Sequence, residues 1–541
     1  MSYSTSDQLA WVWLVTKGYH IKIGLYILME TVSVALVLCF VYWSKQAVDI
    51  ATGITSGALA KTLIFITGSI VLAIMADLMA SWMVESVKVR LTIRLQDSLI
   101  YSQMMSAWTM TKRWHTGDLL VRMNADCPEV VQMLAYTFPS FCVTCVKLLA
   151  SLGFLWVMDP MLAGMMLAIT PLFLFAKVYY KRMRRLSKSV KQAESHLGAV
   201  MQENLKHRLL IRALQSTTGR WGKLLDCQDL VLRLKVNQLK FSVFTQGILK
   251  LTFNAGYLLA FFWGVYRLQL GQISYGTMTA FLQLVGRIQM PAIAMVAFLP
   301  AAIRCRTATD RLMELGEGEK EAEGVAITPG TPLSLRLNNL SFCYEGRKII
   351  GHMSAVFQSG APAAIVGATG KGKTTLIRLM LALIKPDKGT LSLESGGKSY
   401  GVSVHTRGNF AYVPQGNTLF TGTVRENLLL AGPGVSEGRL REVLDIACAG
   451  FVYSLPQGID TLVGESGHGL SEGQAQRIAI ARALLRGGSI WLFDEATSAL
   501  DVHTANQLIS NLLQAGQDKI LIFVTHDPHL MEACSQVIRL D

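Results

Sequence analysis

Six apolar stretches, each long enough to cross a lipid bilayer, dominate the N-terminal part of this chain. A helix needs about 20 residues to span the hydrocarbon core. The stretches lie near residues 23–43, 62–84, 138–158, 161–179, 248–270 and 277–303. Only 16% of all residues are charged, whereas about 25% is usual in soluble domains. We therefore expect an all-α transmembrane domain of six helices.

Two long connections separate these stretches. Residues 85–137 and 180–247 are polar, show helical periodicity and lack the Gly and Pro density of a loose loop. At about 1.5 Å per residue, each could form two helices that run tens of ångströms out of the membrane and back. The transmembrane domain is therefore predicted to carry long cytoplasmic helical extensions.

Lysine and arginine gather on one side of this predicted domain. The long connections hold 6 and 14 of them, whereas the short connections hold only Lys45 and Lys61, with Arg267 at an edge. Basic loops mark the cytoplasmic side, which predicts a multi-pass protein of the cell (inner) membrane with both termini in the cytoplasm. Because the basic excess lies beside apolar segments, we expect contact with membrane lipid and no nucleic-acid partner.

The composition of the chain changes after residue 315. Residues 316–332 are rich in acidic residues, Gly and Pro, and are predicted to link the transmembrane domain (1–315) to a second domain (333–541). That domain alternates short β-rich runs with helical stretches, a pattern typical of an α/β fold with a largely parallel core sheet. The runs include Leu333–Leu340, Ala363–Val366, Phe410–Val413, Ser489–Phe493 and Ile520–Val524.

A phosphate-binding loop follows one of these runs. Residues 367–375 read GATGKGKTT, the GxxxxGK[ST] pattern of a P-loop between a strand and an apolar helix. Its glycines let backbone N–H groups surround phosphate oxygens, and the helix N-terminus attracts negative charge. Lys373 is expected to reach the β- and γ-phosphates, and Thr374 to bind Mg²⁺. The predicted nucleotide-binding loop consists of Gly367, Ala368, Thr369, Gly370, Lys371, Gly372, Lys373, Thr374 and Thr375.

Two adjacent carboxylates, Asp494 and Glu495, follow the run near residues 489–493. An acid at a strand end beside a P-loop suits the magnesium shell, and a second acid suits the polarisation of an attacking water. An acidic pair at a strand end is common in itself, so its meaning depends on the neighbouring motifs. Together with the P-loop, it is consistent with a nucleotide-hydrolysing site that uses Mg²⁺.

A third motif, Gly469-Leu-Ser-Glu-Gly-Gln474, stands between the P-loop and Asp494. It resembles the LSGGQ signature of ATP-binding-cassette (ABC) ATPases, which other P-loop proteins lack. Further elements match the same family in order and spacing. They are Tyr344 (the aromatic residue that stacks on adenine), Gln415 (Q-loop), Ser498–Asp501 (D-loop) and His526 (switch histidine).

The resemblance implies a role for each of these motif residues. The catalytic residues implied are Glu495, His526 and Gln415. The Mg²⁺ ligands implied are Thr374, Gln415 and Asp494. The further nucleotide contacts implied are Tyr344, Gln415, Asp494, Ser471, Gly473, Gln474 and Asp501. In the family, the signature residues complete the ATP site of the opposite subunit, so the chain is expected to pair with a second one.

The membrane half resembles that of exporter-type (type IV fold) ABC half-transporters. Residues 116–126 resemble the first intracellular loop of the family, and residues 201–214 resemble the second, which docks on the partner's cassette. The resemblance implies ATP-driven transport, with export favoured, by alternating access. Because the chain keeps the catalytic motif residues, a homodimer is favoured over a heterodimer.

The sequence leaves the substrate and the direction of transport open. A lipid, a peptide, a drug-like amphiphile and a metal chelate all fit, because cavity residues diverge within the family. Some siderophore importers share the exporter fold, and an ATP-gated channel or regulator would use the same architecture. The fused membrane spans exclude a soluble ABC ATPase.

The signature departs from the family pattern at Glu472, which replaces its first glycine. Ser471 and Gly473, the residues expected to approach the γ-phosphate, are both retained. We favour a neutral role for Glu472, in which its side chain points away from the nucleotide. The alternative is that a carboxylate near the triphosphate slows turnover through like-charge repulsion.

Five charged residues interrupt the apolar stretches: Glu30, Asp77, Lys147, Lys250 and Arg287. Exposure of a charge to lipid is costly, so such residues usually face a bundle interior or a water-filled cavity. Glu30 and Lys147 are the deepest and are therefore cavity candidates. Helix–helix pairing or snorkelling toward the interface is the more common explanation for such residues.

Overall fold

The computed structural model of the chain describes residues 3–540, except for 109–115, 170–175, 317–319, 322–323, 345, 369, 433 and 465–468. The chain divides into two compact units. The first comprises residues 1–103 and 115–317, and the second comprises residues 104–114 and 318–541. The main division falls near residue 317, and a short piece of the 85–137 connection belongs to the second unit.

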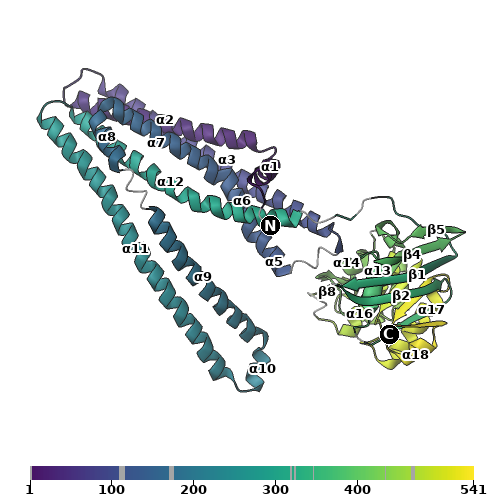
Figure 1. Ribbon diagram of the computed structural model, residues 1–541. Helices are drawn as coiled ribbons and strands as arrows, with labels where there is room; N and C mark the ends of the chain where they lie inside the picture. The colour runs from purple at the N-terminus through teal and green to yellow at the C-terminus, as the bar shows by residue number, and fades with distance from the viewer. Residues whose placement is uncertain are drawn as a thin grey trace. The chain divides into compact units, whose positions relative to one another are not determined.

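The first unit is helical (Figure 1). Its helices are α1 (Thr5–Val15), α2 (His20–Ala51), α3 (Leu59–Met104), α5 (Thr116–Val121), α6 (Cys127–Gln132), α7 (Phe138–Met158), α8 (Pro160–Ile169), α9 (Ala176–Lys206), α10 (Arg208–Ala213), α11 (Thr217–Gln269) and α12 (Tyr275–Gly316). Two π-helical turns, Arg122–Asp126 and Met133–Thr137, flank α6.

The predicted long extension is present as a pair of helices. α9 and α11 run side by side in opposite directions, and the short helix α10 lies at their far turn (Figure 1). α11 alone has 53 residues, which at about 1.5 Å per residue is far longer than a bilayer requires. The excess length confirms that the polar 180–247 connection continues the apolar helices rather than forming a loop.

Four helical runs among the described residues are long and apolar enough to cross a membrane. They are α2, α3, Gly117–Met158 and α11. The predicted spans near 161–179 and 277–303 each include residues or side chains outside the description. A total of six spans therefore stays a prediction.

The hairpin predicted at Asp159-Pro160 joins α7 directly to α8. The Asp159 carboxylate is buried and accepts hydrogen bonds from the backbone N–H groups of Met161 and Leu162, which caps α8. It also accepts a hydrogen bond from Trp263 Nε1 and pairs with Arg267 at 3.4 Å, both on α11. The Asp159 carboxylate therefore holds the start of α8 against α11.

The second unit contains two main sheets. The antiparallel sheet has the order β2-β1-β4-β5, with β1 (Leu333–Tyr344), β2 (Arg347–Gln358), β4 (Lys388–Ser395) and β5 (Lys398–Gly401). The parallel sheet has the order β11-β3-β10-β9-β6, with β3 (Ala363–Val366), β6 (Phe410–Val413), β9 (Ile490–Asp494), β10 (Ile520–Val524) and β11 (Gln536–Arg539). A short pair, β7 (Gly422–Thr423) and β8 (Leu462–Val463), lies apart from them.

Helices complete this α/β unit (Figure 1). They are α13 (Lys373–Met380), α14 (Val424–Leu429), α15 (Glu437–Ile446), α16 (Glu472–Arg486), α17 (Val502–Ala515) and α18 (Pro528–Glu532). The residues of β3, β9 and β10 are all buried, as expected for central parallel strands covered on both faces. Because these strands are parallel, their C-terminal ends meet at one edge of the sheet, where ligands bind in such folds.

The predicted linker is held against the second unit over part of its length. Arg407 makes a bidentate ion pair with Glu321, at 2.7 and 2.9 Å. Further along, Asn409 Nδ2 donates a hydrogen bond to the Ile327 carbonyl, and the Ile327 N–H donates to the His405 carbonyl. The described part of residues 320–332, within the predicted linker, is thus bound to the α/β unit.

Candidate active site

The predicted P-loop connects the end of β3 to the start of α13. Gly372 precedes the helix with a φ of 94°, and a Cβ there would lie 3.0 Å from Ile349 Cγ2, so glycine is required for both conformation and space. Lys373 is the first residue of α13, and its Nζ donates a hydrogen bond to the Gly367 carbonyl at 2.7 Å. The lysine thus folds back over the loop that would hold phosphates. Thr369 lies outside the described residues.

The Glu495 carboxylate is where the predicted catalytic side chains meet. Gln415 Nε2 donates a hydrogen bond to Glu495 Oε2 at 2.6 Å. His526 Nε2 lies 3.7 Å from Glu495 Oε1, and Lys373 Nζ lies 4.0 Å from the same oxygen. Lys373 and His526 also contact one another. Three residues separated by up to 153 positions in the chain therefore converge on one carboxylate.

The backbone of Glu495 is held in an unusual conformation. Its φ is 52°, in the left-handed region that non-glycine residues rarely adopt. Its N–H donates to the Val524 carbonyl, and its own carbonyl accepts hydrogen bonds from Gln476 Nε2 at 2.8 Å and Ser498 Oγ at 2.9 Å. Such strain persists where surrounding contacts fix it, and it is frequent at active sites.

Asp494 ends β9 and is buried. Burial raises the pKa of Asp494 to about 6, the neighbouring Glu495 carboxylate raises it as well, and Lys373 lowers it. Two adjacent carboxylates beside a P-loop supply the oxygen donors that Mg²⁺ prefers, and their mutual repulsion favours a bound cation. Thr374, a second predicted ligand beside Asp494 and Gln415, is exposed at the start of α13. These residues fit a magnesium ion.

The signature motif forms the N-terminus of α16. Ser471 Oγ accepts a hydrogen bond from the Gln474 N–H, and Gln474 Oε1 accepts one from the Ser471 N–H, which makes a capping box. Gly473 is buried against the D-loop, where an added Cβ would lie 2.5 Å from the Ala499 carbonyl oxygen. Glu472 is exposed in the first turn of α16, where a carboxylate is favourable to the helix.

The structure does not join the signature to the carboxylate cluster of the same chain. No hydrogen bond or ion pair between described residues links Ser471, Gln474 or Asp501 to Lys373, Glu495 or His526. Asp501 instead caps α17 by accepting a hydrogen bond from the Thr504 N–H, and this bond lowers the pKa of its carboxyl group. Within the described part of one chain, the predicted residues therefore form two separate groups.

Two known family profiles match the chain. The one described as "ABC transporter" matches residues 350–498, and the one described as "ABC transporter transmembrane region" matches residues 23–292. The chain belongs to the ABC transporter family. As an ABC transporter, it couples ATP hydrolysis to transport across a membrane.

Full-length relatives and a solved structure agree with this assignment. A Rickettsia bellii protein named for an export ATP-binding/permease function is 25% identical over 90% of this chain and 86% of its own. The mouse mitochondrial ATP-binding cassette sub-family B member 10 is 27% identical over 83% of this chain and 64% of its own. A bacterial Atm1-family ABC exporter with ATP bound superimposes with a TM-score of 0.80, at 21% identity, over 97% of this chain and 94% of that one. The ABC transporter therefore has the exporter-type fold.

The sequence does not predict three residues that contact the site residues of this ABC transporter: Gln476, Arg378 and Trp108. Gln476 supports the Glu495 carbonyl, as described above. Arg378 donates a hydrogen bond to Tyr344 Oη at 3.5 Å and lies over the ring of Trp108, 5.7 Å from its centroid. Trp108 comes from the 85–137 connection, and next to it Ser106 forms a β-bridge with Lys320. None of these contacts is local in sequence, so no motif could reveal them.

The Mg²⁺ requirement of ATP hydrolysis is expected to increase as the pH falls below about 6. Because the pKa of Asp494 is raised in the folded protein, its carboxyl group keeps its proton up to a pH of about 6. As the pH rises through that value, the carboxyl group ionises and the stability of the metal-free protein decreases. Metal binding needs the ionised form, so the half-saturating free Mg²⁺ should rise about tenfold per pH unit below that value and stay flat above it. Steady-state ATPase assays at fixed Mg–ATP would measure this. A pH-independent requirement would contradict the role of Asp494.

Proposed function

We propose that two copies of this chain form an ATP-driven exporter that works by alternating access. The observation that carries the proposal is the convergence of Lys373, Gln415 and His526 on Glu495, in a chain whose other half is a bundle of long apolar helices. ATP binding would draw two cassettes together, and hydrolysis would separate them. The helical extensions would transmit that motion to the membrane.

The proposal gives each residue of the site a step. Lys373 would bind the β- and γ-phosphates, Glu495 would orient and activate the attacking water, and His526 would contact the γ-phosphate. Thr374, Gln415 and Asp494 would hold Mg²⁺. The ion would neutralise charge on the β- and γ-phosphate oxygens.

The separation of the two residue groups supports a composite site. The N-terminus of α16 presents Ser471 and Glu472 at the surface, so the positive end of the helix dipole faces outward, where a phosphate from outside the chain could approach it. If Ser471, Gly473, Gln474 and Asp501 act on ATP, they act most simply on the ATP of a second subunit. Homodimerisation follows, because each chain carries both groups.

Exposed apolar side chains around α10 support the same conclusion. Leu209 is 81% exposed, and Leu205 and Leu214 are 69% and 65% exposed. Clustered apolar residues at a surface mark a site of protein contact. A partner's cassette is the surface that α10 would cover in an exporter dimer.

Export is favoured over import by the names of the relatives. Besides the Rickettsia protein, a Pediococcus acidilactici relative, 28% identical over 79% of this chain, is named for pediocin PA-1 transport and processing. We propose a cell-membrane location with both termini in the cytoplasm, from the basic connections. The substrate would be an amphipathic molecule of the lipid, peptide or drug-like class.

The purified chain, reconstituted alone in lipid, tests the proposal. It should hydrolyse ATP, and light scattering of the active particle should give two chains. A folded two-chain particle without ATPase activity would contradict a self-sufficient homodimeric ATPase and indicate that a different partner subunit is needed. Activity in single-chain particles would contradict the composite site.

A further inference from the structure

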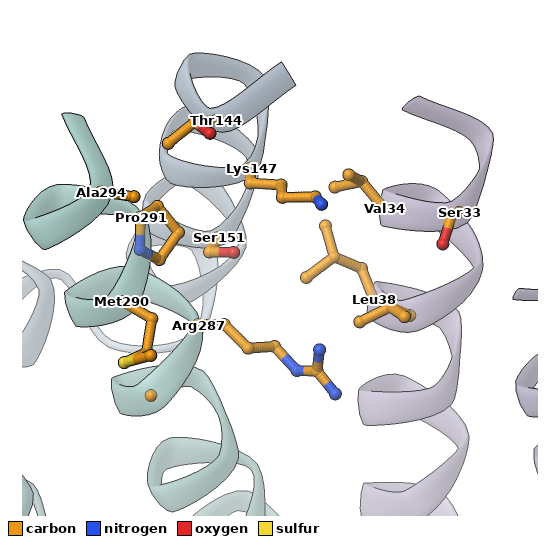
Figure 2. A pocket seen from close by; sticks show the side chains of 12 residues that line it. Ser33, Val34, Leu38, Thr144, Lys147, Ser151, Arg287, Met290, Pro291 and Ala294 are labelled. Atoms are coloured by element: carbon orange, nitrogen blue, oxygen red, sulfur yellow. The ribbon is translucent and has the colours of Figure 1, made fainter. Parts of the chain in front are cut away.

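A cavity of about 490 Å³ lies between helices α2, α7 and α12 of the membrane half. Its volume falls within the range of small-molecule binding sites. It is lined by Ser33, Val34, Val37, Leu38, Thr144, Lys147, Ser151, Gly286, Arg287, Met290, Pro291 and Ala294. Figure 2 shows that Lys147 from α7 and Arg287 from α12 extend into the space that Val34 and Leu38 of α2 border.

The two cations of this cavity differ in their partners. Lys147 Nζ pairs with the buried carboxylate of Glu30, on α2, at 2.9 Å. This pair joins the two deep charges that the sequence analysis identifies: Lys147 lines the cavity, whereas Glu30 is not among the lining residues. No hydrogen bond or ion pair joins the Arg287 guanidinium to any described residue. Counted together, Glu30, Lys147 and Arg287 leave the cavity with one unbalanced positive charge.

An unbalanced arginine within a membrane-spanning bundle is costly unless a ligand or water compensates it. The planar guanidinium presents paired N–H donors that match a carboxylate or phosphate in a bidentate arrangement. Most of the remaining lining, including Leu38, Met290 and Pro291, is apolar. The cavity therefore offers one anion-binding group within an apolar surround.

We propose that this cavity binds the single negative charge of an amphiphilic substrate, a carboxylate or a phosphodiester, through Arg287. The Lys147–Glu30 pair flanks the anion without adding net charge. The inference rests on the proposed function in one respect, since it takes the cavity to be on the transport route. It narrows the substrate class from any amphiphile to monoanionic ones.

Three small dansyl compounds of matched shape test the charge preference by equilibrium fluorescence. They are dansylglycine, its neutral amide dansylglycinamide, and the cationic N-dansylethylenediamine. The full chain in phosphatidylcholine nanodiscs, corrected with empty nanodiscs, should bind the acid at least about tenfold more tightly than the amide, because an ionised acceptor strengthens the hydrogen bonds to Arg287. Equal affinities for the acid and the amide would overturn the proposal.

Variants then assign the preference to one residue. Arg287→Gln should remove the difference between acid and amide, and Arg287→Lys should restore part of it. Arg306→Gln is the matched control, because it removes the same charge from an exposed position on the same helix and should bind like wild type. A preference that persists in Arg287→Gln would contradict the assignment. If that variant does not fold, the three-probe comparison on wild type decides the matter.

Adding phosphatidylglycerol to the nanodiscs distinguishes two sources of the anion. Displacement of dansylglycine by this lipid would identify a phospholipid headgroup, and lack of displacement would identify a free organic acid. Both results support an anion site. The binding assay needs no ATP. If the chain hydrolyses ATP but binds the acid no more tightly than the amide, the anion site is contradicted and the proposed transport function is not. Selective binding by a folded chain without ATPase activity would contradict only the proposed function.

Discussion

A Glu495→Gln variant is expected to bind ATP and to hydrolyse it about a hundredfold more slowly than wild type, or slower still. The substitution preserves the size of the side chain but removes the charge that would accept a proton from water. The backbone contacts from Val524, Gln476 and Ser498 do not depend on that charge, so the strained conformation should persist. Steady-state ATPase assays and equilibrium binding of a fluorescent ATP analogue would separate the two effects.

The matched control for this variant is Glu442→Gln. Glu442 is exposed on α15 and pairs only with its helical neighbour Arg439 among described residues, so its loss should leave turnover unchanged. Near wild-type hydrolysis by Glu495→Gln would mean that another group, such as His526, activates the water. Loss of ATP binding along with turnover would instead indicate that the carboxylate organises Lys373 and the P-loop.

The parts of this molecule that sequence predicts best are those in which function depends on adjacent residues. The P-loop is such a case, because its glycines, Lys373 and the helix N-terminus lie within nine residues of one another. The helical membrane half was predictable for a similar reason, because a helix long enough to span a bilayer leaves a long, mostly apolar run. The exporter-type fold was expected only from the resemblance of the motifs to the ABC family. The predicted extension 180–247 also needed only local periodicity.

Contacts between distant segments were not predictable. The Glu30–Lys147 pair joins residues 117 positions apart, and the sequence alone does not identify which residue each of these charges contacts. Gln476 follows the signature motif by two residues. Its hydrogen bond to the Glu495 carbonyl depends on where β9 ends relative to α16, which the sequence does not show. The contacts of the linker are a further case, because Gly and Pro content cannot reveal that Arg407 binds Glu321.

A Gly473→Ala variant is expected to lose about tenfold or more of its ATPase activity and to unfold at a temperature a few degrees lower. The added Cβ would lie 2.5 Å from the Ala499 carbonyl oxygen and 3.0 Å from Leu500 Cδ2. Since backbone cannot give way as a side chain does, either the D-loop or the first turn of α16 must move, at a typical cost of about 1–3 kcal/mol. Both elements carry residues that we expect to face a partner's ATP.

The chain contains its own control for this prediction. Ser436-Glu437-Gly438 begins α15 as Ser471-Glu472-Gly473 begins α16, and in both helices the serine caps the first turn. No heavy atom would lie within 4 Å of a Cβ at Gly438. Gly438→Ala should therefore leave ATPase activity unchanged and stabilise the protein slightly, by about 0.5–1 kcal/mol, through the better helix propensity of alanine. If both variants behaved alike in ATPase and thermal unfolding assays, the contact between Gly473 and the D-loop would have no role in catalysis. If only Gly473→Ala lost activity, close packing against the D-loop would explain why the signature needs a glycine at position 473. That requirement would be independent of the charge that Glu472 introduces.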